Sequence, residues 1–133
     1  MSAVFADTFG LLALLNARDA NHARAERAFA NLRARQASLV STSFVLVETY
    51  ALVGRRLGLD AVRSFREDFA PLIDVVWVDE AAHNAGLDLL LERRKRLLSL
   101  VDAVSFITMR QRNVAETFAF DPHFEQEGFS IVS

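Results

Sequence analysis

Short apolar runs of strand length alternate with helical segments along this chain, and that alternation restricts the fold more than any other feature. The clearest run, residues 73–78, is rich in valine and is bounded by Pro71 and Asp79. Parallel strands need crossover connections, which are usually right-handed and helical. The pattern therefore predicts an α/β fold in which helices cover both faces of a mostly parallel sheet.

The same alternation predicts where each element lies. Strands are expected at residues 3–6, 38–40, 73–78, 117–120 and 129–132. Helices are expected after Asp7-Thr8, after an Asp19 cap, from the 41–43 Ser/Thr cluster to Gly58, from Asp60 to before Pro71, at residues 80–91, and after a Ser99 cap.

The chain has the size of one ordinary domain. Its 133 residues are 52% hydrophobic, so we expect residues 1–133 to form a single domain around one core. No cysteine occurs, which leaves oxygen and histidine as the metal ligands available. No uncharged stretch reaches the ~18 residues of a membrane span, and Asp7 interrupts an N-terminus without a basic start. We expect a soluble, cytoplasmic protein.

The charge of the chain bears on its partners. A net charge of −2, from 15 basic and 17 acidic residues, at first argues against nucleic acid. Without four acids that are assigned below to a metal site, the count becomes 15 against 13, or +2. All but one of the basic residues are arginine, whose planar fork suits phosphate. They cluster at 55–56, at 93–96, and at 110 and 112, and each cluster has a second interpretation as a solvated helix face.

Four carboxylic acids stand in apolar surroundings, whereas most of the other acids lie among charges. Asp7 ends the first expected strand and Asp121 follows the fourth. Glu48 lies inside one apolar helix, and Asp102 begins another. Ligands of parallel α/β sheets gather beyond the carboxyl ends of the strands, so we expect the acids that follow strands to project there.

A group of buried carboxylates needs a positive partner. Carboxylates held close together repel one another so strongly that some stay protonated at neutral pH. A divalent cation removes this cost, and oxygen ligands without cysteine suit Mg²⁺ or Mn²⁺. Such a site usually keeps water ligands and takes further oxygens from a phosphate substrate. The acids therefore predict a site that acts on phosphates.

Each acid also has a structural interpretation. Ser99 and Asp102 have the spacing of a capping box. Asp7 and Asp121 both stand where a helix N-cap is expected. Glu48 fits no cap, although an arginine could pair with it. Taken one at a time, capping competes with metal binding at three of the four positions.

Other catalytic patterns are absent from the sequence. The histidines, His22, His83 and His123, lack the short spacing of a zinc site, so we expect surface or packing roles for them. No glycine-rich phosphate loop and no Gly-x-Ser-x-Gly nucleophile elbow occurs. Nucleotide triphosphatases and serine hydrolases are therefore not indicated.

The acids in their contexts together resemble the PIN-domain ribonucleases, and most closely the VapC-type toxins of bacterial toxin-antitoxin pairs. The resemblance covers essentially the whole chain and rests on FADT at 5–8, SFVLVET at 43–49, SLVDAVSF at 99–106, FDPHF at 120–124 and GF at 128–129. It implies a three-layer α/β/α sandwich with a mostly parallel central sheet and an acidic cluster that binds Mg²⁺ or Mn²⁺.

Carried onto this chain, the resemblance identifies four catalytic residues and metal ligands, Asp7, Glu48, Asp102 and Asp121. Thr8 and Ser105 would be hydroxyl groups behind these ligands. The family often has threonine where Val101 stands, and a hydroxyl two residues before its last acid, where this chain has Ala119. Both departures concern the surroundings of the ligands more than the metal site.

The resemblance also implies an activity and partners. The activity is metal-assisted hydrolysis of RNA phosphodiester bonds without a covalent intermediate, with arginines on the RNA backbone. The partners are a second copy of the chain, in a homodimer, and a small antitoxin whose C-terminal segment covers the acidic site. Two alternatives stay open. One is a PIN-like module that binds RNA or protein without cleaving, and the other is a receiver-like signalling domain, which needs a late lysine where this chain has only Lys95.

Overall fold

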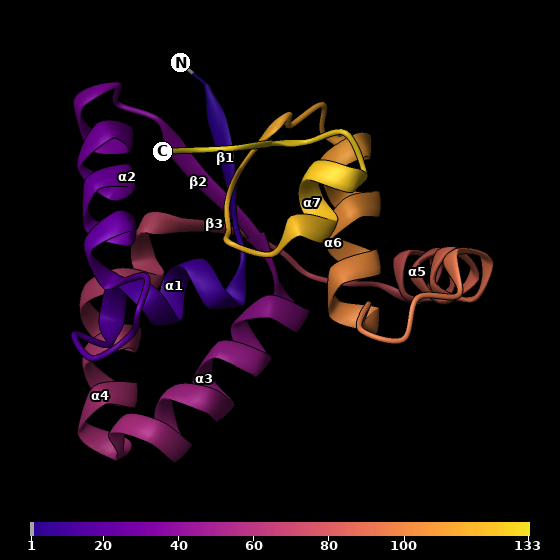
Figure 1. Ribbon diagram of the computed structural model, residues 1–133. Coiled ribbons are helices and arrows are strands. Elements are labelled where there is room, and N and C mark those ends of the chain that lie inside the picture. Colours follow the sequence, from indigo (N-terminus) through magenta and orange to yellow (C-terminus); the bar gives the residue numbers. More distant parts are fainter. Residues whose placement is uncertain (1) are drawn as a thin grey trace.

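The computed structural model describes residues 2–133 and shows a parallel sheet between two layers of helices (Figure 1). The strand order is β3-β2-β1-β4-β5, and every pairing is parallel. The strands are β1 (Ala3–Ala6), β2 (Ser38–Thr42), β3 (Ile73–Val76), β4 (Glu116–Phe118) and β5 (Ser130–Ile131). The predicted α/β/α sandwich is confirmed.

Helices connect successive strands. The α-helices are α1 (Thr8–Leu15), α2 (His22–Ala34), α3 (Ser43–Leu57), α4 (Leu59–Ser64), α5 (Glu80–Arg93), α6 (Leu100–Gln111) and α7 (Pro122–Gln126). A π-helical turn, η1 (Phe65–Phe69), and a 3₁₀ turn, η2 (Ala70–Leu72), follow α4. In Figure 1, α1 and α2 lie on one side of the sheet and α6 and α7 on the other, with α5 outside α6.

Several predicted boundaries were wrong: the second strand runs to Thr42, and the fourth and fifth strands are Glu116–Phe118 and Ser130–Ile131. Two further differences have a clear cause. The second helix begins at His22 with Asn21 as its N-cap, because the Asp19 carboxylate accepts a hydrogen bond from the N–H of Asn21 (2.8 Å) and so holds the preceding turn. The third strand ends at Val76 rather than Val78, since its last partner on β2 is Thr42, where α3 takes over the chain.

Buried hydroxyl groups join the three inner strands. The Ser41 hydroxyl on β2 donates to the carbonyl of Ala6 (2.7 Å), and the Thr117 hydroxyl on β4 donates to the carbonyl of Phe5 (3.1 Å). A buried polar group is costly unless it is hydrogen-bonded, so these bonds satisfy groups that lie within the core. They also hold the end of β1, which Asp7 follows, between its two neighbours.

The first helix makes a very close approach to β4. A Cβ at Gly10 would lie 2.2 Å from the carbonyl oxygen of Phe118, so only glycine fits there without a shift. The N–H of Asp7 donates to that same carbonyl (3.1 Å). α1 therefore begins directly at the junction of β1 and β4, and this junction determines where the Asp7 carboxylate lies. Within residues 2–133, no helix has both the length and the apolar character needed to cross a membrane.

Candidate metal centre

Three of the four predicted acids cap helices that begin at the carboxyl edge of the sheet or beside it. Asp7 is the N-cap of α1 and accepts from the N–H of Phe9 (3.4 Å), and Asp121 is the N-cap of α7 and accepts from the N–H of His123 (2.9 Å). Asp102 and Ser99 form the predicted capping box at the start of α6. Each of these bonds engages one oxygen of the carboxylate, so capping and metal binding are compatible.

Asp7 is buried at the centre of this group. Among residues 2–133 it is the only acidic or basic residue that is fully buried, with 1% of its surface exposed. Burial and the charge of Asp102 raise the pKa of Asp7 to about 8, against hydrogen bonds from the Phe9 and Thr8 N–H groups that lower it. The charge of Glu48 adds to the increase. Helix capping alone leaves this burial unexplained.

The pKa of Asp102 is raised as well, by burial and in part by the charges of other acids. Burial raises the pKa of Asp102, hydrogen bonds with Ser99 oppose that increase, and the charges of Asp121 and Glu48 add to it. Asp102 therefore interacts electrostatically with Asp7, Glu48 and Asp121. Electrostatic interactions thus connect the four predicted acids, but among residues 2–133 only Asp102 and Asp121, together with His123, form a group whose ligand atoms lie within 4.8 Å of one another.

Glu48 projects from the second turn of α3 and is partly buried. From the sequence, an ion pair between Glu48 and an arginine was one possibility. In the part of the chain that the structure describes, Glu48 forms no ion pair and no side-chain hydrogen bond. Within these residues no cationic side chain compensates the charge of Glu48, which adds to the repulsion at Asp7 and Asp102.

His123 lies at the acidic group, which the sequence did not predict. One ligand atom each from Asp102, Asp121 and His123 lies within 4.8 Å of the others. The Nδ1 atom of His123 is 2.8 Å from Oδ1 of Asp121 but is not aligned for a hydrogen bond. The available signal was position, since His123 stands in the first turn of the helix that Asp121 caps.

The two predicted hydroxyl groups differ in their contacts. The Thr8 hydroxyl, directly after Asp7, is buried and has no hydrogen-bond partner among the residues that the structure describes. The Ser105 hydroxyl donates to the carbonyl of Val101 (2.8 Å), within its own helix. Roles behind metal ligands stay predictions for both.

The residues fit a divalent cation. A buried carboxylate with a raised pKa, three further acids and unpartnered polar atoms on Thr8 and His123 form a donor set dominated by oxygen. Mutual repulsion of these groups is the cost that a cation relieves. Oxygen donors with one nitrogen suit Mg²⁺ or Mn²⁺ better than a thiolate-selecting ion.

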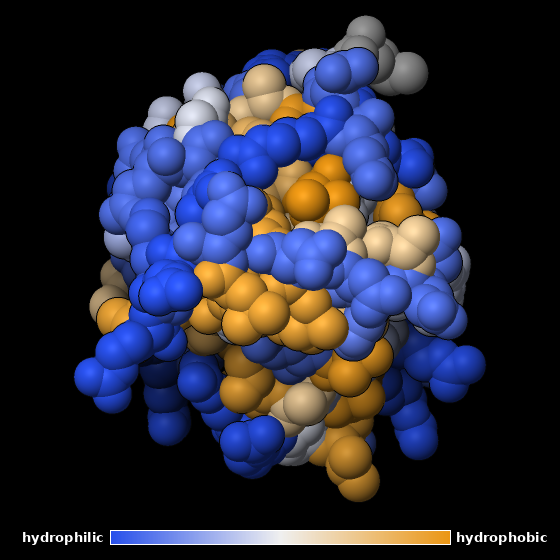
Figure 2. All heavy atoms as spheres, turned by 90° about the vertical axis from the view of Figure 1, so that its right-hand side faces the viewer, coloured by the Kyte–Doolittle hydropathy of each residue, from blue (hydrophilic) through white to orange (hydrophobic). Residues whose placement is uncertain are grey.

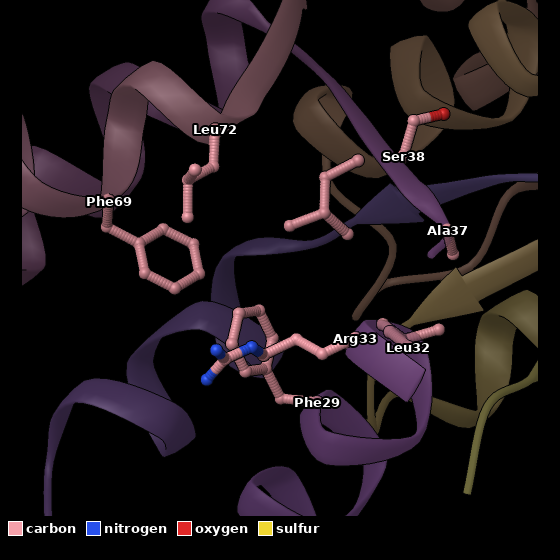
Figure 3. Close-up of a pocket in the computed structure, with 8 residues that line it drawn as sticks. Phe29, Leu32, Arg33, Ala37, Ser38, Phe69 and Leu72 are labelled. Atoms are coloured by element: carbon pink, nitrogen blue, oxygen red, sulfur yellow. The ribbon is translucent and has the colours of Figure 1, made fainter. Parts of the chain in front are cut away.

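An apolar hollow lies elsewhere on the molecule. In Figure 3, side chains from α2 face Phe69 and Leu72 across a cavity of about 470 Å³ beside the start of β2. Its lining consists of Phe29, Leu32, Arg33, Ala37, Ser38, Leu39, Phe69 and Leu72. None of these is one of the acids, so the hollow and the acidic group are separate features.

A model of the PIN domain family matches residues 4–129. The chain therefore belongs to the PIN domain family, and the resemblance inferred from the sequence is confirmed. Among characterised proteins it is similar to VapC20 of Mycobacterium tuberculosis, named a 23S rRNA-specific endonuclease, in two strains. The identity is 32% over 127 residues, which are 95% of each chain.

Solved structures agree with this assignment. The crystal structure of VapC20, described as a sarcin-ricin loop cleaving toxin, matches with a TM-score of 0.83 and 31% identity over 95% of both chains. FitAcB from Neisseria gonorrhoeae shares the fold with a TM-score of 0.69 and 14% identity, covering 98% of this chain and 96% of that one. VapBC2 from Rickettsia felis, bound to a DNA fragment from its promoter, matches with a TM-score of 0.70 and 13% identity, covering 97% of this chain and 96% of that one.

Proposed function

We propose that this chain is a metal-dependent endoribonuclease that hydrolyses RNA phosphodiester bonds and acts as the toxin of a toxin-antitoxin pair. One observation carries the proposal: the Asp7 carboxylate is buried, and burial together with the charges of Asp102 and Glu48 raises its pKa to about 8. An acidic group of this kind is costly for the protein unless a cation neutralises it. Membership of the PIN family and the similarity to VapC20 support RNA as the substrate.

Asp7, Asp102, Glu48 and Asp121 would hold Mg²⁺ or Mn²⁺. When bound, the cation would activate a water molecule and stabilise charge on the phosphate in the transition state. The protein's part is to hold the carboxylates still. Asp7, Asp102 and Asp121 are each fixed by a hydrogen bond at a helix start.

The structure narrows the choice of arginines for RNA binding. Arg93 and Arg110 both bind Glu127, with distances of 2.8 Å, and Arg112 lies 3.2 Å from Asp74. These guanidinium groups already have carboxylate partners. The cluster at 110 and 112 is therefore a weaker candidate for phosphate contacts than the sequence indicated.

Arg94 and Arg96 are the better candidates. Both are exposed, and neither forms an ion pair within residues 2–133. Their loop joins α5 to α6 and ends at the Ser99 cap, one turn before Asp102. The Nζ atom of Lys95 between them donates to Gln126 at the end of α7 (2.8 Å), which fixes the loop beside the helix that Asp121 caps. We infer that this loop contacts the RNA backbone.

Cleavage assays test the proposal. The relative VapC20 suggests 23S rRNA as the first substrate, with tRNA and messenger RNA in parallel. We expect Mn²⁺-dependent cleavage that EDTA abolishes and that Asp102→Asn lowers by at least about 100-fold. Asp88→Asn, which alters an exposed acid on α5, is the matched control and should retain activity. Equal activity in Asp102→Asn would contradict the proposal, and binding without cleavage by the wild type would favour the non-cleaving module.

Partners are proposed from the family resemblance. We infer that residues 1–133 act as one domain in the cytoplasm, that a cognate antitoxin covers the acidic site, and that the chain forms a homodimer. Figure 2 shows hydrophobic residues between hydrophilic ones on the face that carries α5, and Leu91 and Leu97 are 70% and 86% exposed. Light scattering that gives the mass of one chain, 14.9 kDa, would contradict the homodimer.

A further inference from the structure

We propose that His123 is a nitrogen ligand of the metal centre and that it makes this centre prefer Mn²⁺ to Mg²⁺. The inference rests on the proposed function, because it assumes that the acids hold a divalent cation. It adds a residue that the acidic pattern in the sequence did not include, and it specifies the class of ion.

The geometry of the group fits ligands of a single ion. His123 Nδ1 lies 2.8 Å from Oδ1 of Asp121, and Asp102 supplies an oxygen within 4.8 Å of ligand atoms on both residues. Two ligands bound at right angles with bonds of about 2.1 Å lie about 3.0 Å apart. The separation between His123 and Asp121 is therefore close to that of neighbouring positions around one ion.

The His123 ring lacks a partner at this atom. Nδ1 is buried and forms no hydrogen bond within residues 2–133, while Oδ1 of Asp121 already accepts the N–H of His123 (2.9 Å). A nitrogen lone pair and a carboxylate oxygen at this distance repel unless a proton or a cation lies between them. His22 differs, because its Nδ1 lies 2.7 Å from the carbonyl oxygen of Ala13.

Packing holds the backbone on both sides of His123 in place. Asp121 caps α7 and Pro122 occupies its first turn, which restricts the backbone directly before His123. The next residue, Phe124, is fully buried and packs edge-on against Phe106 of α6 at 5.0 Å between ring centroids. α6 also carries Asp102, so His123 and Asp102 are fixed relative to each other.

Ligand chemistry gives the selectivity. Imidazole nitrogen binds transition metals well, whereas Mg²⁺ strongly prefers oxygen ligands and retains its water. A nitrogen donor therefore adds binding energy for Mn²⁺ that Mg²⁺ does not gain. If His123 instead shared only a proton with Asp121, it would orient that carboxylate and support both ions equally.

Electron spin-echo envelope modulation of Mn²⁺ bound to the wild-type protein separates these cases without any activity assay. We expect modulation from a directly bound nitrogen, which changes to the ¹⁵N pattern when the protein is labelled with ¹⁵N-histidine. The labelling needs no variant, so the test stands even if a substitution at this position prevents folding. His123→Gln should lose the signal, and the matched control His83→Gln should keep it.

The affinities of the protein for Mn²⁺ and Mg²⁺ provide a second test. By calorimetry, His123→Gln should bind Mn²⁺ at least about tenfold more weakly and Mg²⁺ less than about threefold more weakly. Tight Mn²⁺ binding without nitrogen coupling, or equal losses for both ions, would overturn the role of His123 and leave the proposed function intact. Absence of Mn²⁺ binding by the wild type would overturn the metal centre itself.

Discussion

Asp7 and Asp102 lie far apart in the sequence, yet the charge of Asp102 is second only to burial among the causes that raise the pKa of Asp7. The end of β1 and the first turn of α6 therefore share one electrostatic environment. A carboxylate in such an environment takes up a proton or a cation more readily than an exposed acid does. Protons and metal ions should therefore compete for Asp7.

The metal-free protein should become less stable as the pH rises. The folded pKa of Asp7, about 8, exceeds the ordinary aspartate pKa of 3.8, so its contribution to stability is fully present below about pH 3.8 and is lost toward pH 8. Asp7→Asn keeps a capping oxygen but removes the charge. In EDTA, the unfolding free energy of Asp7→Asn minus that of the wild type should increase by more than about 1 kcal/mol between pH 5 and pH 8. Urea titrations measure this, and an advantage independent of pH would refute it.

Glu127 should stabilise the protein through its ion pairs with Arg93 on α5 and Arg110 on α6. Its side chain is 6% exposed, and hydrogen bonds from Arg93 and then Arg110 lower its pKa to about 2. This contribution is fully present above the ordinary glutamate pKa of 4.5 and is lost as the pH falls toward 2. We expect Glu127→Gln to cost about 2 kcal/mol of unfolding free energy at pH 7 and much less at pH 3.

The control for Glu127 is Glu92→Gln. Glu92 also pairs with Arg93, at 3.3 Å, but its side chain is 72% exposed. Exposed pairs contribute little, so the cost should stay below about 0.5 kcal/mol. Equal losses in the two variants would show that burial of Glu127 has no special effect.

Gly10→Ala should disturb the site through the fold. The new methyl group would lie 2.2 Å from the carbonyl oxygen of Phe118, so α1 must move away from β4 and carry the Asp7 cap with it. We expect a loss of about 2 kcal/mol in stability and weaker Mn²⁺ binding by calorimetry. Gly54→Ala is the control, because its methyl group meets only a Val62 side-chain atom at 3.3 Å and alanine favours the helix. Unchanged Mn²⁺ affinity in Gly10→Ala would contradict the coupling.

The loop before α6 should carry phosphate contacts. Arg94→Ala combined with Arg96→Ala, in an Asp102→Asn background that prevents cleavage, should weaken RNA binding and reduce the slope of log affinity against log salt by roughly 1.5. Arg33→Ala, at the apolar hollow beside the start of β2, should leave the slope unchanged. Filter binding at several salt concentrations measures both. A slope lost equally in the two variants would refute the assignment.

Sequence patterns predicted most of the elements because each depends on local chemistry. Three helix ends were predicted correctly from local sequence. They are the Ser99 N-cap, the Gly58 C-cap, whose φ is 93°, and the helix start at Pro122 after Asp121. The capping interpretations of Asp7, Asp102 and Asp121 are confirmed as well. They competed with metal binding only while each acid was considered alone.

Other features depended on partners that are distant in the sequence. His123 was expected to be a surface or packing residue, because nothing next to it in the sequence indicates how its ring is oriented. The arginines at 110 and 112 looked available for RNA, but Glu127 and Asp74 bind them from other elements. The third strand is two residues shorter than predicted because its partner strand β2 ends at Thr42, which pairs with Val76.

The sequence by itself determined the alternation of strands and helices, the positions of the caps and the presence of acids in apolar surroundings. These follow from periodicity, propensity and the cost of burying charge, which are properties of short stretches. Only the tertiary structure decided that Asp7 is buried near the charge of Asp102, that Glu48 has no cationic partner within residues 2–133, and that ligand atoms of His123 and Asp102 lie within 4.8 Å of each other. Electrostatic interactions depend on distance in space, and the parallel sheet sets those distances by bringing its strand ends together.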